Sequence, residues 1–234
     1  MSIIILFVGL LALIAGWWLA RQRLAAKPWL EEGALGEFPG TEATALPAVK
    51  VGLGVFLAVV GALFALFLSA YSMRMGLEDW RSIPTPGLLW PNTGMLIMSS
   101  IALQWAKVSA DRDDADVTKV CLVAGGVFAA GFLIGQLLVW RQLNASGYFL
   151  AANPANAFFY LITGLHGLHM LGGLVALERT IEKAWRGGAT DQVRLSVDLC
   201  AMYWHFLLLI WLILFSLLTG WADQFVEICR QLLT

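Results

Sequence analysis

Long uninterrupted runs of apolar residues alternate with short polar segments along this chain of 234 residues. A transmembrane helix needs about 20 mainly apolar residues. Six runs meet this length: residues 2–20, 51–73, 88–105, 119–140, 157–177 and 199–219. None of them alternates apolar and polar positions as a barrel strand does. Because unpaired backbone groups are costly in hydrocarbon, runs of this kind must cross the membrane as helices.

The pattern therefore predicts an all-α polytopic membrane protein with six transmembrane helices, one N-terminal helix plus a five-helix bundle. The N-terminal helix takes residues 1–20. A cytoplasmic linker with three prolines and four glutamates follows over residues 21–49, so we expect this helix to sit apart from the others. The five-helix bundle takes residues 50–221, and residues 222–234 form a C-terminal tail on the outer side.

Composition supports the membrane assignment. Hydrophobic residues make up 59% of the chain and charged residues 13%, whereas soluble domains have about 45–50% and roughly 25%. Six helices would use roughly 120 residues, which leaves no segment for a separate globular domain. A formal net charge of −1 argues against a nucleic-acid partner.

The three cysteines form no CxxC pair, so neither a disulfide framework nor a zinc ribbon is predicted.

The basic residues predict the orientation. Eleven of the fifteen Lys and Arg residues fall in the connections on one side of the six predicted helices. By the positive-inside rule that side faces the cytoplasm, so both termini lie on the outer side. The eleven are Arg21, Arg23, Lys27, Lys50, Lys107, Arg112, Lys119, Arg179, Lys183, Arg186 and Arg194.

The interiors of the predicted spans hold almost no ionisable side chain apart from histidine. Pumps, channels and transporters normally place charged residues at membrane depth, so these classes are disfavoured. No nucleophile–base pair, phosphate loop or metal-ligand spacing is present either. The sequence therefore predicts no catalytic, cofactor-binding or metal-binding residue in this chain.

Three histidines occupy the last two spans. His166 and His169 lie three residues apart in the fifth span, and His205 lies in the sixth. At about 1.5 Å per residue, His169 and His205 are both roughly 9–12 Å from the predicted cytoplasmic end. They could ligate a haem as in a bis-histidine membrane b-type cytochrome. We favour neutral histidines that hydrogen-bond between helices, together with the other polar residues at depth: Ser99, Ser100, Gln104, Gln136 and Thr163.

Two motifs and one shorter segment carry a family resemblance. The fifth span contains Thr163-Gly164-Leu165-His166-Gly167-Leu168-His169, and Tyr203-Trp204-His205-Phe206 follows about 35 residues later. The third span contains Pro91-Asn92-Thr93. Over about residues 50–221 the chain resembles subunit III of the haem-copper terminal oxidases, the cytochrome c oxidase subunit III family.

The resemblance implies a non-catalytic core subunit of a respiratory complex that reduces oxygen to water. Such a subunit stabilises the catalytic subunit I, which holds the haem and copper, and it binds phospholipids; subunit II is a further expected partner. The expected location is the inner (cytoplasmic) membrane of a bacterium. The residues that the resemblance marks as packing or lipid-site candidates are His166, His169, Trp204, His205, Thr163, Gly164, Gly167, Asn92, Thr93 and Gln136.

Two departures from the family pattern remove ionisable groups. Family members often carry a glutamate in the helix that matches the second span, but the residues around Val59 are all apolar. An aspartate frequently follows the histidine of the second motif by three residues, and here that position is Leu208. Both departures favour a structural role over a role in proton uptake. The accessory subunit of a nitric oxide reductase, which shares the motifs, is the alternative.

Overall fold

The computed structural model describes residues 48–75, 77–81, 83–187 and 190–220, and in these ranges every regular element is an α-helix. The all-α prediction is confirmed for this part of the chain. The predicted N-terminal helix (1–20), nearly all of the predicted linker (21–49) and the predicted tail (222–234) lie outside the described residues.

Helix α2 spans Ala48–Arg74. Its residues 51–73 are uncharged and lie between Lys50 and Arg74, so the helix presents one continuous apolar segment long enough for hydrocarbon. Small residues recur along it, which is typical of helices that approach a neighbour closely. The observed helix begins three residues before the predicted span and ends one residue after it.

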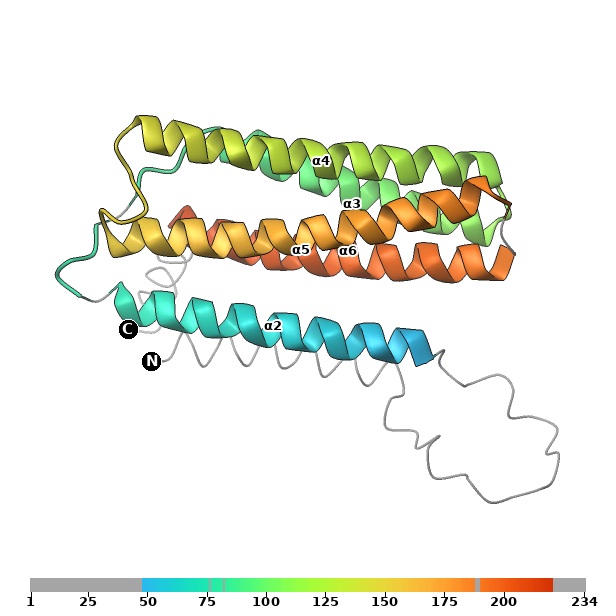
Figure 1. Ribbon diagram of the computed structural model, residues 1–234, viewed down its shortest axis with the longest axis horizontal. Helices are drawn as coiled ribbons and strands as arrows, with labels where there is room; N and C mark the ends of the chain where they lie inside the picture. The colour runs from blue at the N-terminus through green and yellow to red at the C-terminus, as the bar shows by residue number, and fades with distance from the viewer. Residues whose placement is uncertain (1–47, 76, 82, 188–189, 221–234) are drawn as a thin grey trace, which may run out of the picture. The chain divides into compact units, whose positions relative to one another are not determined.

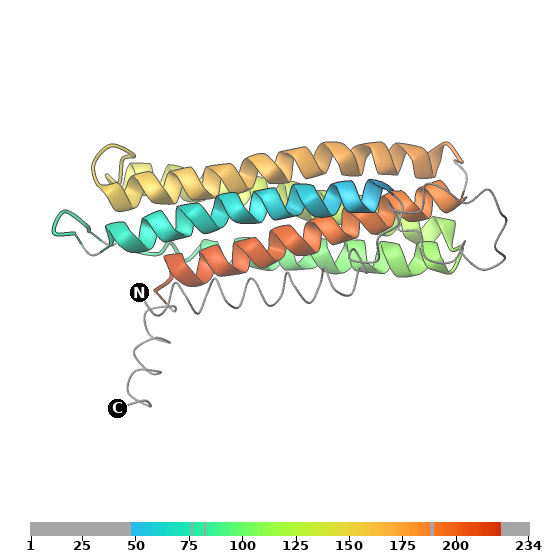
Figure 2. The same cartoon turned by 90° about the horizontal axis from the view of Figure 1, so that it is seen from below.

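Four further helices follow, and consecutive helices within this group run antiparallel to each other (Figures 1 and 2). Each packs mainly against two of the others: α3 contacts α4 and α6, and α5 also contacts α4 and α6. Short connections at residues 112–114, 146–153 and 186–189 impose this antiparallel order. The four helices are α3 (Leu89–Asp111), α4 (Ala115–Ala145), α5 (Pro154–Trp185) and α6 (Thr190–Leu218).

The observed helices are longer than the apolar runs because polar residues cap them outside the predicted spans. Asp114 Oδ1 accepts a hydrogen bond from Val117 N at 3.2 Å and starts α4 four residues before the run at 119. Asn153 Oδ1 accepts from Ala155 N at 3.2 Å, and Pro154 occupies the first turn of α5. An apolar run thus locates the part of a helix suited to hydrocarbon, whereas the caps decide where the helix begins.

Four of the described helices are long and apolar enough to cross a membrane, whereas five were predicted for the same part of the chain. The four candidate spans are Val49–Arg74, Ala115–Ala145, Pro154–Trp185 and Asp191–Leu218. The exception is α3, whose composition is diluted by Asn92, Thr93, Ser99 and Ser100. All four of these side chains are buried against neighbouring helices rather than turned outward.

Small residues allow α3 and α4 to approach closely. A Cβ atom at Gly125 would lie 2.8 Å from Leu103 Cγ, and one at Gly131 would lie 2.9 Å from Met95 Sδ. Ser99 Oγ donates to the Gly125 carbonyl oxygen at 2.7 Å across the same contact. Without a hydrophobic driving force in lipid, close backbone packing and hydrogen bonds of this kind hold helices together.

Candidate functional site

An aromatic cluster occupies the centre of the α3–α6 bundle. His166 of α5 lies against Trp211 of α6, with ring centroids 5.2 Å apart, and against Phe132 of α4 at 5.8 Å. Phe132 and Trp211 meet edge to face at 4.8 Å. All three side chains have an exposed fraction of 0%. His166 is therefore part of the core that joins three helices.

Helix α3 joins this centre through a hydroxyl group. Trp211 Nε1 donates to Thr93 Oγ1 at 3.0 Å, and Thr93 Oγ1 donates to the Leu89 carbonyl oxygen at 2.8 Å. The indole nitrogen of a buried tryptophan usually needs such an acceptor. Thr93 and His166 thus meet the same residue, Trp211, although they lie on different helices.

Two buried amides join α3 to α4. Asn92 Nδ2 donates to Gln136 Oε1 at 3.2 Å, and the two side chains are 2% and 4% exposed. Gly135 makes room for this pair, since a Cβ atom at that position would overlap the Asn92 amide. The sequence marked Asn92 and Gln136 as candidates, and the structure brings them together.

His205 binds α3 through both of its ring nitrogens. Nε2 lies 2.9 Å from Gln104 Oε1, and Nδ1 lies 2.5 Å from Ser100 Oγ. Because an amide oxygen only accepts, Nε2 donates to Gln104, and in the neutral ring Nδ1 accepts from Ser100. A haem iron would have to displace one of these bonds, so the geometry gives the b-type cytochrome alternative no support at His205.

We expect His205→Leu to weaken the association of α6 with α3 by about 0.6–2 kcal/mol, the usual range for interhelical hydrogen bonds in membranes. The loss can be measured as the shift in the free energy of unfolding in mixed detergent micelles. Leu212→Val, seven residues further along α6 and partly exposed, is the control and should change the value little. An unfolding free energy equal to wild type in His205→Leu would contradict this role.

The motif residues Thr163 and Gly164 form the contact between α5 and α4. Trp140 Nε1 donates to Thr163 Oγ1 at 3.1 Å, and Thr163 Oγ1 donates to the Phe159 carbonyl oxygen at 2.6 Å. A Cβ atom at Gly164 would lie 3.3 Å from the Trp140 ring. The Thr163 hydroxyl group binds the Trp140 indole nitrogen, and the absence of a side chain at Gly164 leaves room for the Trp140 ring.

The other motif residues are separated from this contact. His169 is only half-buried, and its Nδ1 lies 2.8 Å from the Leu165 carbonyl oxygen in the same helix. The His169 carbonyl oxygen accepts from Tyr203 OH of α6 at 2.8 Å. Trp204 is fully buried, and Gly167 lies beside Leu133, whose Cδ2 would be 3.7 Å from a Cβ atom at the glycine. His166 and His169 therefore lie in different surroundings, since His166 is fully buried and His169 is half-buried.

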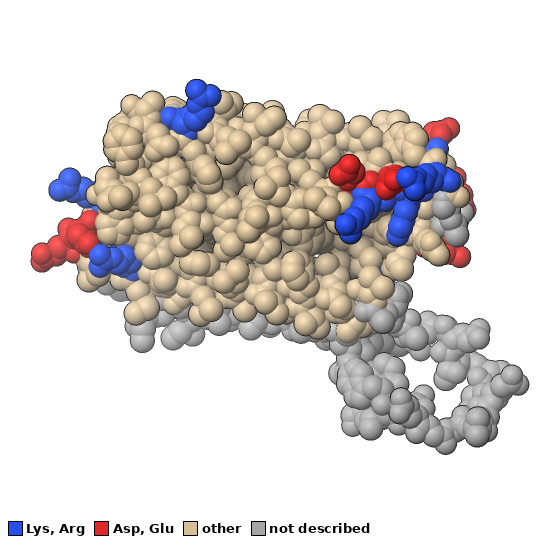
Figure 3. Space-filling view, viewed as in Figure 1, with Lys and Arg blue, Asp and Glu red and all other residues tan. Residues whose placement is uncertain are grey.

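Charged side chains gather where α3 and α5 end and α4 and α6 begin (Figure 3). We call this the basic end, and it comprises residues 107–119, 179–187 and 191–194. Lys107 Nζ lies 2.5 Å from Asp198 Oδ1, and Arg194 Nη2 lies 2.7 Å from Asp113 Oδ2. Arg194 Nε also donates to the Ala110 carbonyl oxygen at 2.9 Å. These bonds extend the α3–α6 contact beyond its apolar part.

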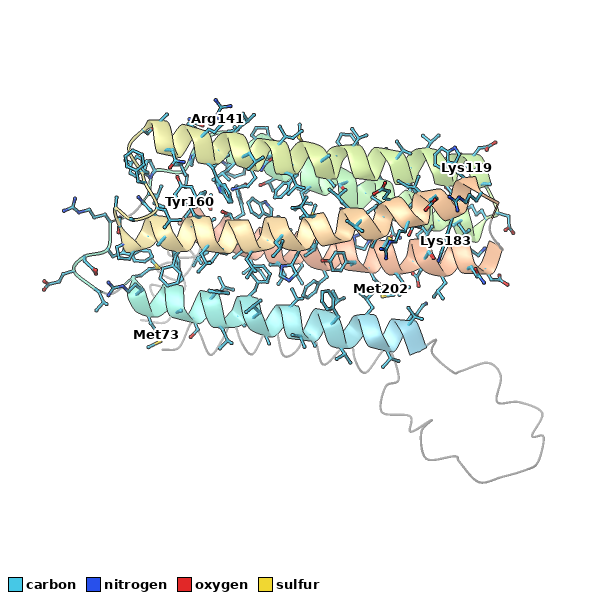
Figure 4. All side chains as sticks on the ribbon, in the orientation of Figure 1. Met73, Lys119, Arg141, Tyr160, Lys183 and Met202 are labelled. Atoms are coloured by element: carbon cyan, nitrogen blue, oxygen red, sulfur yellow. The ribbon has the colours of Figure 1, made fainter. Side chains whose placement is uncertain are left out.

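Figure 4 places Lys119 and Lys183 at the basic end and Tyr160 toward the opposite end. Tyr160 OH donates to the Tyr148 carbonyl oxygen at 3.0 Å and lies 3.1 Å from Asn144 Oδ1. A cavity of about 300 Å³ also opens at this opposite end, and it is lined by residues 71, 75, 80, 83–86, 89, 155, 159 and 217–220. Hydrogen bonds of Tyr160 thus connect α5 with the α4–α5 connection at this end, and ion pairs join α3 and α6 at the basic end.

Among the described residues no group of three or more His, Cys, Asp or Glu side chains is placed to hold a metal ion. What the candidate residues do in this structure is to join helices. Sequence reasoning missed Phe132, Trp140 and the Lys107–Asp198 ion pair. The antiparallel order of α3 and α6 could have revealed the ion pair. Along two antiparallel helices the residue numbers rise on one and fall on the other, so the two numbers of each contacting pair add up to a nearly constant sum.

Comparison with known proteins identifies relatives of this chain independently of the structure. A family model described as cytochrome c oxidase subunit III matches residues 49–223, which include all five described helices except the first residue of α2. The chain is 33% identical over 173 residues to cytochrome c oxidase subunit 3 of Thermostichus vulcanus, covering 72% of this chain and 85% of that protein. It is 30% identical over 177 residues to a probable cytochrome c oxidase subunit 3 of Mycobacterium bovis, covering 73% and 86%.

Proposed function

The chain belongs to the cytochrome c oxidase subunit III family, and we propose that within the oxidase complex it is a non-catalytic core subunit that stabilises the catalytic subunit and binds membrane lipid. The family carries no redox centre of its own. The observation that carries the proposal is the match over residues 49–223, which contains every candidate residue described above.

The contacts inside the bundle support a stabilising role. Trp211 of α6 contacts both His166 of α5 and Thr93 of α3, so these three residues tie α5 and α6 to α3. Asn92 and Gln136 tie α3 to α4. Hydrogen bonds of this kind specify which helix faces meet. A bundle that fixes its own helices in this way can offer a constant surface to a neighbouring subunit.

The expected partners are subunit I, which would hold the haem and copper, subunit II, and phospholipids. We place the protein in the cytoplasmic membrane of a bacterium, since the relatives named above are bacterial. In this arrangement α3 crosses the membrane with the four more apolar helices, a further helix at residues 2–20 brings the total to six, and the basic end faces the cytoplasm.

Purification of the native complex through an affinity tag on this chain tests the proposal. We expect a haem- and copper-containing polypeptide to co-purify and the preparation to consume oxygen. Removing the gene should leave a catalytic subunit that loses activity faster during turnover. Recovery of the chain alone without haem absorbance would contradict the proposal, as would a complex that consumes nitric oxide rather than oxygen.

A further inference from the structure

Helix α3 differs from the other described helices because it is not apolar enough to qualify as a membrane span by itself. Its 23 residues are nevertheless about 35 Å long, which is enough to cross the hydrocarbon layer. It also packs beside α4 and α6, which are both candidate spans (Figures 1 and 2). Part of what makes α3 a membrane helix must therefore come from its neighbours.

Helix α4 supplies partners for polar side chains of α3. Gln136 Oε1 accepts a hydrogen bond from Asn92 Nδ2 at 3.2 Å, and the Gly125 carbonyl oxygen accepts from Ser99 Oγ at 2.7 Å. Asn92 is 2% exposed and Ser99 is 0% exposed. An isolated α3 would turn this amide and this hydroxyl group toward lipid tails, which contain no hydrogen-bonding group. Pairing with α4 removes that cost.

The two helices form a hairpin with a close contact. Only residues 112–114 separate them, and a connection of two to five residues joins antiparallel helices. Of the described helix pairs, α3 and α4 share the most extensive contact. Gly125, Gly131 and Gly135 of α4 lie in it, since a Cβ atom at each would meet a side chain of α3. These contacts involve no residue of another helix.

The partners of α3 on α6 are synthesised later. Helix α4 begins four residues after α3 ends, whereas α6 begins only at Thr190. At about 5–20 residues per second, α6 follows the end of α3 by roughly 4–16 s. His205 of α6, which lies within hydrogen-bonding distance of Ser100 and Gln104, is thus absent when α3 emerges. Of the interhelical bonds of α3, those to α4 can therefore form first.

We propose that α3 enters the membrane paired with α4 as a helical hairpin, and that the Asn92–Gln136 bond between them promotes its entry. Helix α4 is apolar enough to cross by itself, and it shields the polar side of α3 from lipid. The proposal rests on the arrangement proposed above, in which α3 crosses the membrane. It goes further by making the insertion of one helix depend on a residue of the next.

Gln136→Leu tests the pairing in the full-length chain. The change makes α4 more apolar but removes the acceptor of Asn92, so α4 should still cross while α3 crosses less often. The reporter is Asp111→Cys, at the exposed end of α3, in a parent chain whose own three cysteines are replaced by alanine. Spheroplasts receive a membrane-impermeant maleimide directly after a pulse of synthesis. We expect about three- to tenfold more label at position 111 in Gln136→Leu than in the parent.

Two controls separate the pairing from other effects. Gln142→Leu makes the same chemical change in α4 at an exposed position, and His205→Leu removes the later bonds from α6. Both should stay within twofold of the parent. Equal labelling of Gln136→Leu and Gln142→Leu would overturn the proposal. Equal labelling of Gln136→Leu and His205→Leu would also overturn it, because α3 would then depend on the complete bundle.

Asn92→Leu provides a rescue of the Gln136→Leu chain. It removes the amide that has lost its partner and makes α3 more apolar, so the double variant should return to the parent level of label at position 111. A double variant that stays as strongly labelled as Gln136→Leu would show that the Asn92–Gln136 bond does not promote the entry of α3.

A second reporter, Ser146→Cys, distinguishes failure of the arrangement from failure of the pairing. Position 146 is exposed, lies at the opposite end of α4, and should be labelled in every chain. If position 111 is labelled as strongly as position 146 in the parent, α3 does not cross the membrane, and the proposed arrangement fails together with this proposal. If position 111 is equally protected in the parent and in Gln136→Leu, the arrangement stands and the pairing is wrong.

Discussion

Trp211→Ala is expected to destabilise the bundle by about 3–5 kcal/mol, the usual cost of deleting a buried large aromatic side chain. The indole has an exposed fraction of 0% and contacts the rings of Phe132 and His166. Its Nε1 also donates a hydrogen bond from α6 to Thr93 of α3. The variant would therefore lose contacts with three helices at once and leave a cavity at their centre.

Two variants separate the parts of this effect. Trp211→Phe keeps a ring against Phe132 and His166 but removes the donor to Thr93, so its cost should be about 1 kcal/mol. Trp185→Ala deletes a tryptophan that is 54% exposed and lies 5.9 Å from Lys119 Nζ. Its cost should stay below about 1 kcal/mol, because an exposed side chain leaves no cavity.

The measurement is the free energy of unfolding of each variant in mixed micelles, together with the haem retained by the tagged complex at increasing temperature. Trp211→Ala should release the partner at a lower temperature than either control. If Trp185→Ala costs as much as Trp211→Ala, the central cluster does not determine stability.

The helices of the bundle were predictable because their apolar runs exceed the length of a soluble core helix. Their ends were not, since Asp114 and Asn153 cap α4 and α5 in segments that hydropathy alone assigns to connections. The composition of α3 is the least apolar of the five described helices. Its polar residues Asn92, Thr93, Ser99 and Ser100 each form a hydrogen bond with a neighbouring helix, and hydropathy averaged over a single helix cannot show such bonds.

The sequence named the candidate residues as a group but did not indicate which of them contact one another. His166 and His169 lie three residues apart, and three residues on a helix leave about 60° between side chains. That angle is enough to place His166 in the centre, against Phe132 and Trp211, and to leave His169 half-buried. The residue that each histidine contacts depends on how far neighbouring helices are shifted along one another. The sequence of one helix does not determine this shift.

Gly173→Ala is the prediction with the next largest effect, and we expect it to cost about 1–3 kcal/mol, the range for overpacking a well-packed core. A Cβ atom at Gly173 of α5 would lie 2.6 Å from Tyr203 Cε1 and 2.9 Å from Trp204 Cζ3 of α6. Both atoms belong to rigid rings. Tyr203 is further held by its bond to the His169 carbonyl oxygen, so α5 and α6 must separate to admit the methyl group.

The adjacent residue provides a control in the same turn of the same helix. A Cβ atom at Gly172 would meet no atom within 4 Å, and alanine is a better helix former than glycine. Gly172→Ala should therefore leave the unfolding free energy unchanged or raise it slightly, whereas Gly173→Ala lowers it. Because both variants add the same methyl group and remove the same backbone freedom, any difference between them measures the α5–α6 contact alone. Equal stability of the two variants would show that α6 does not approach Gly173 in the membrane as closely as the structure places it.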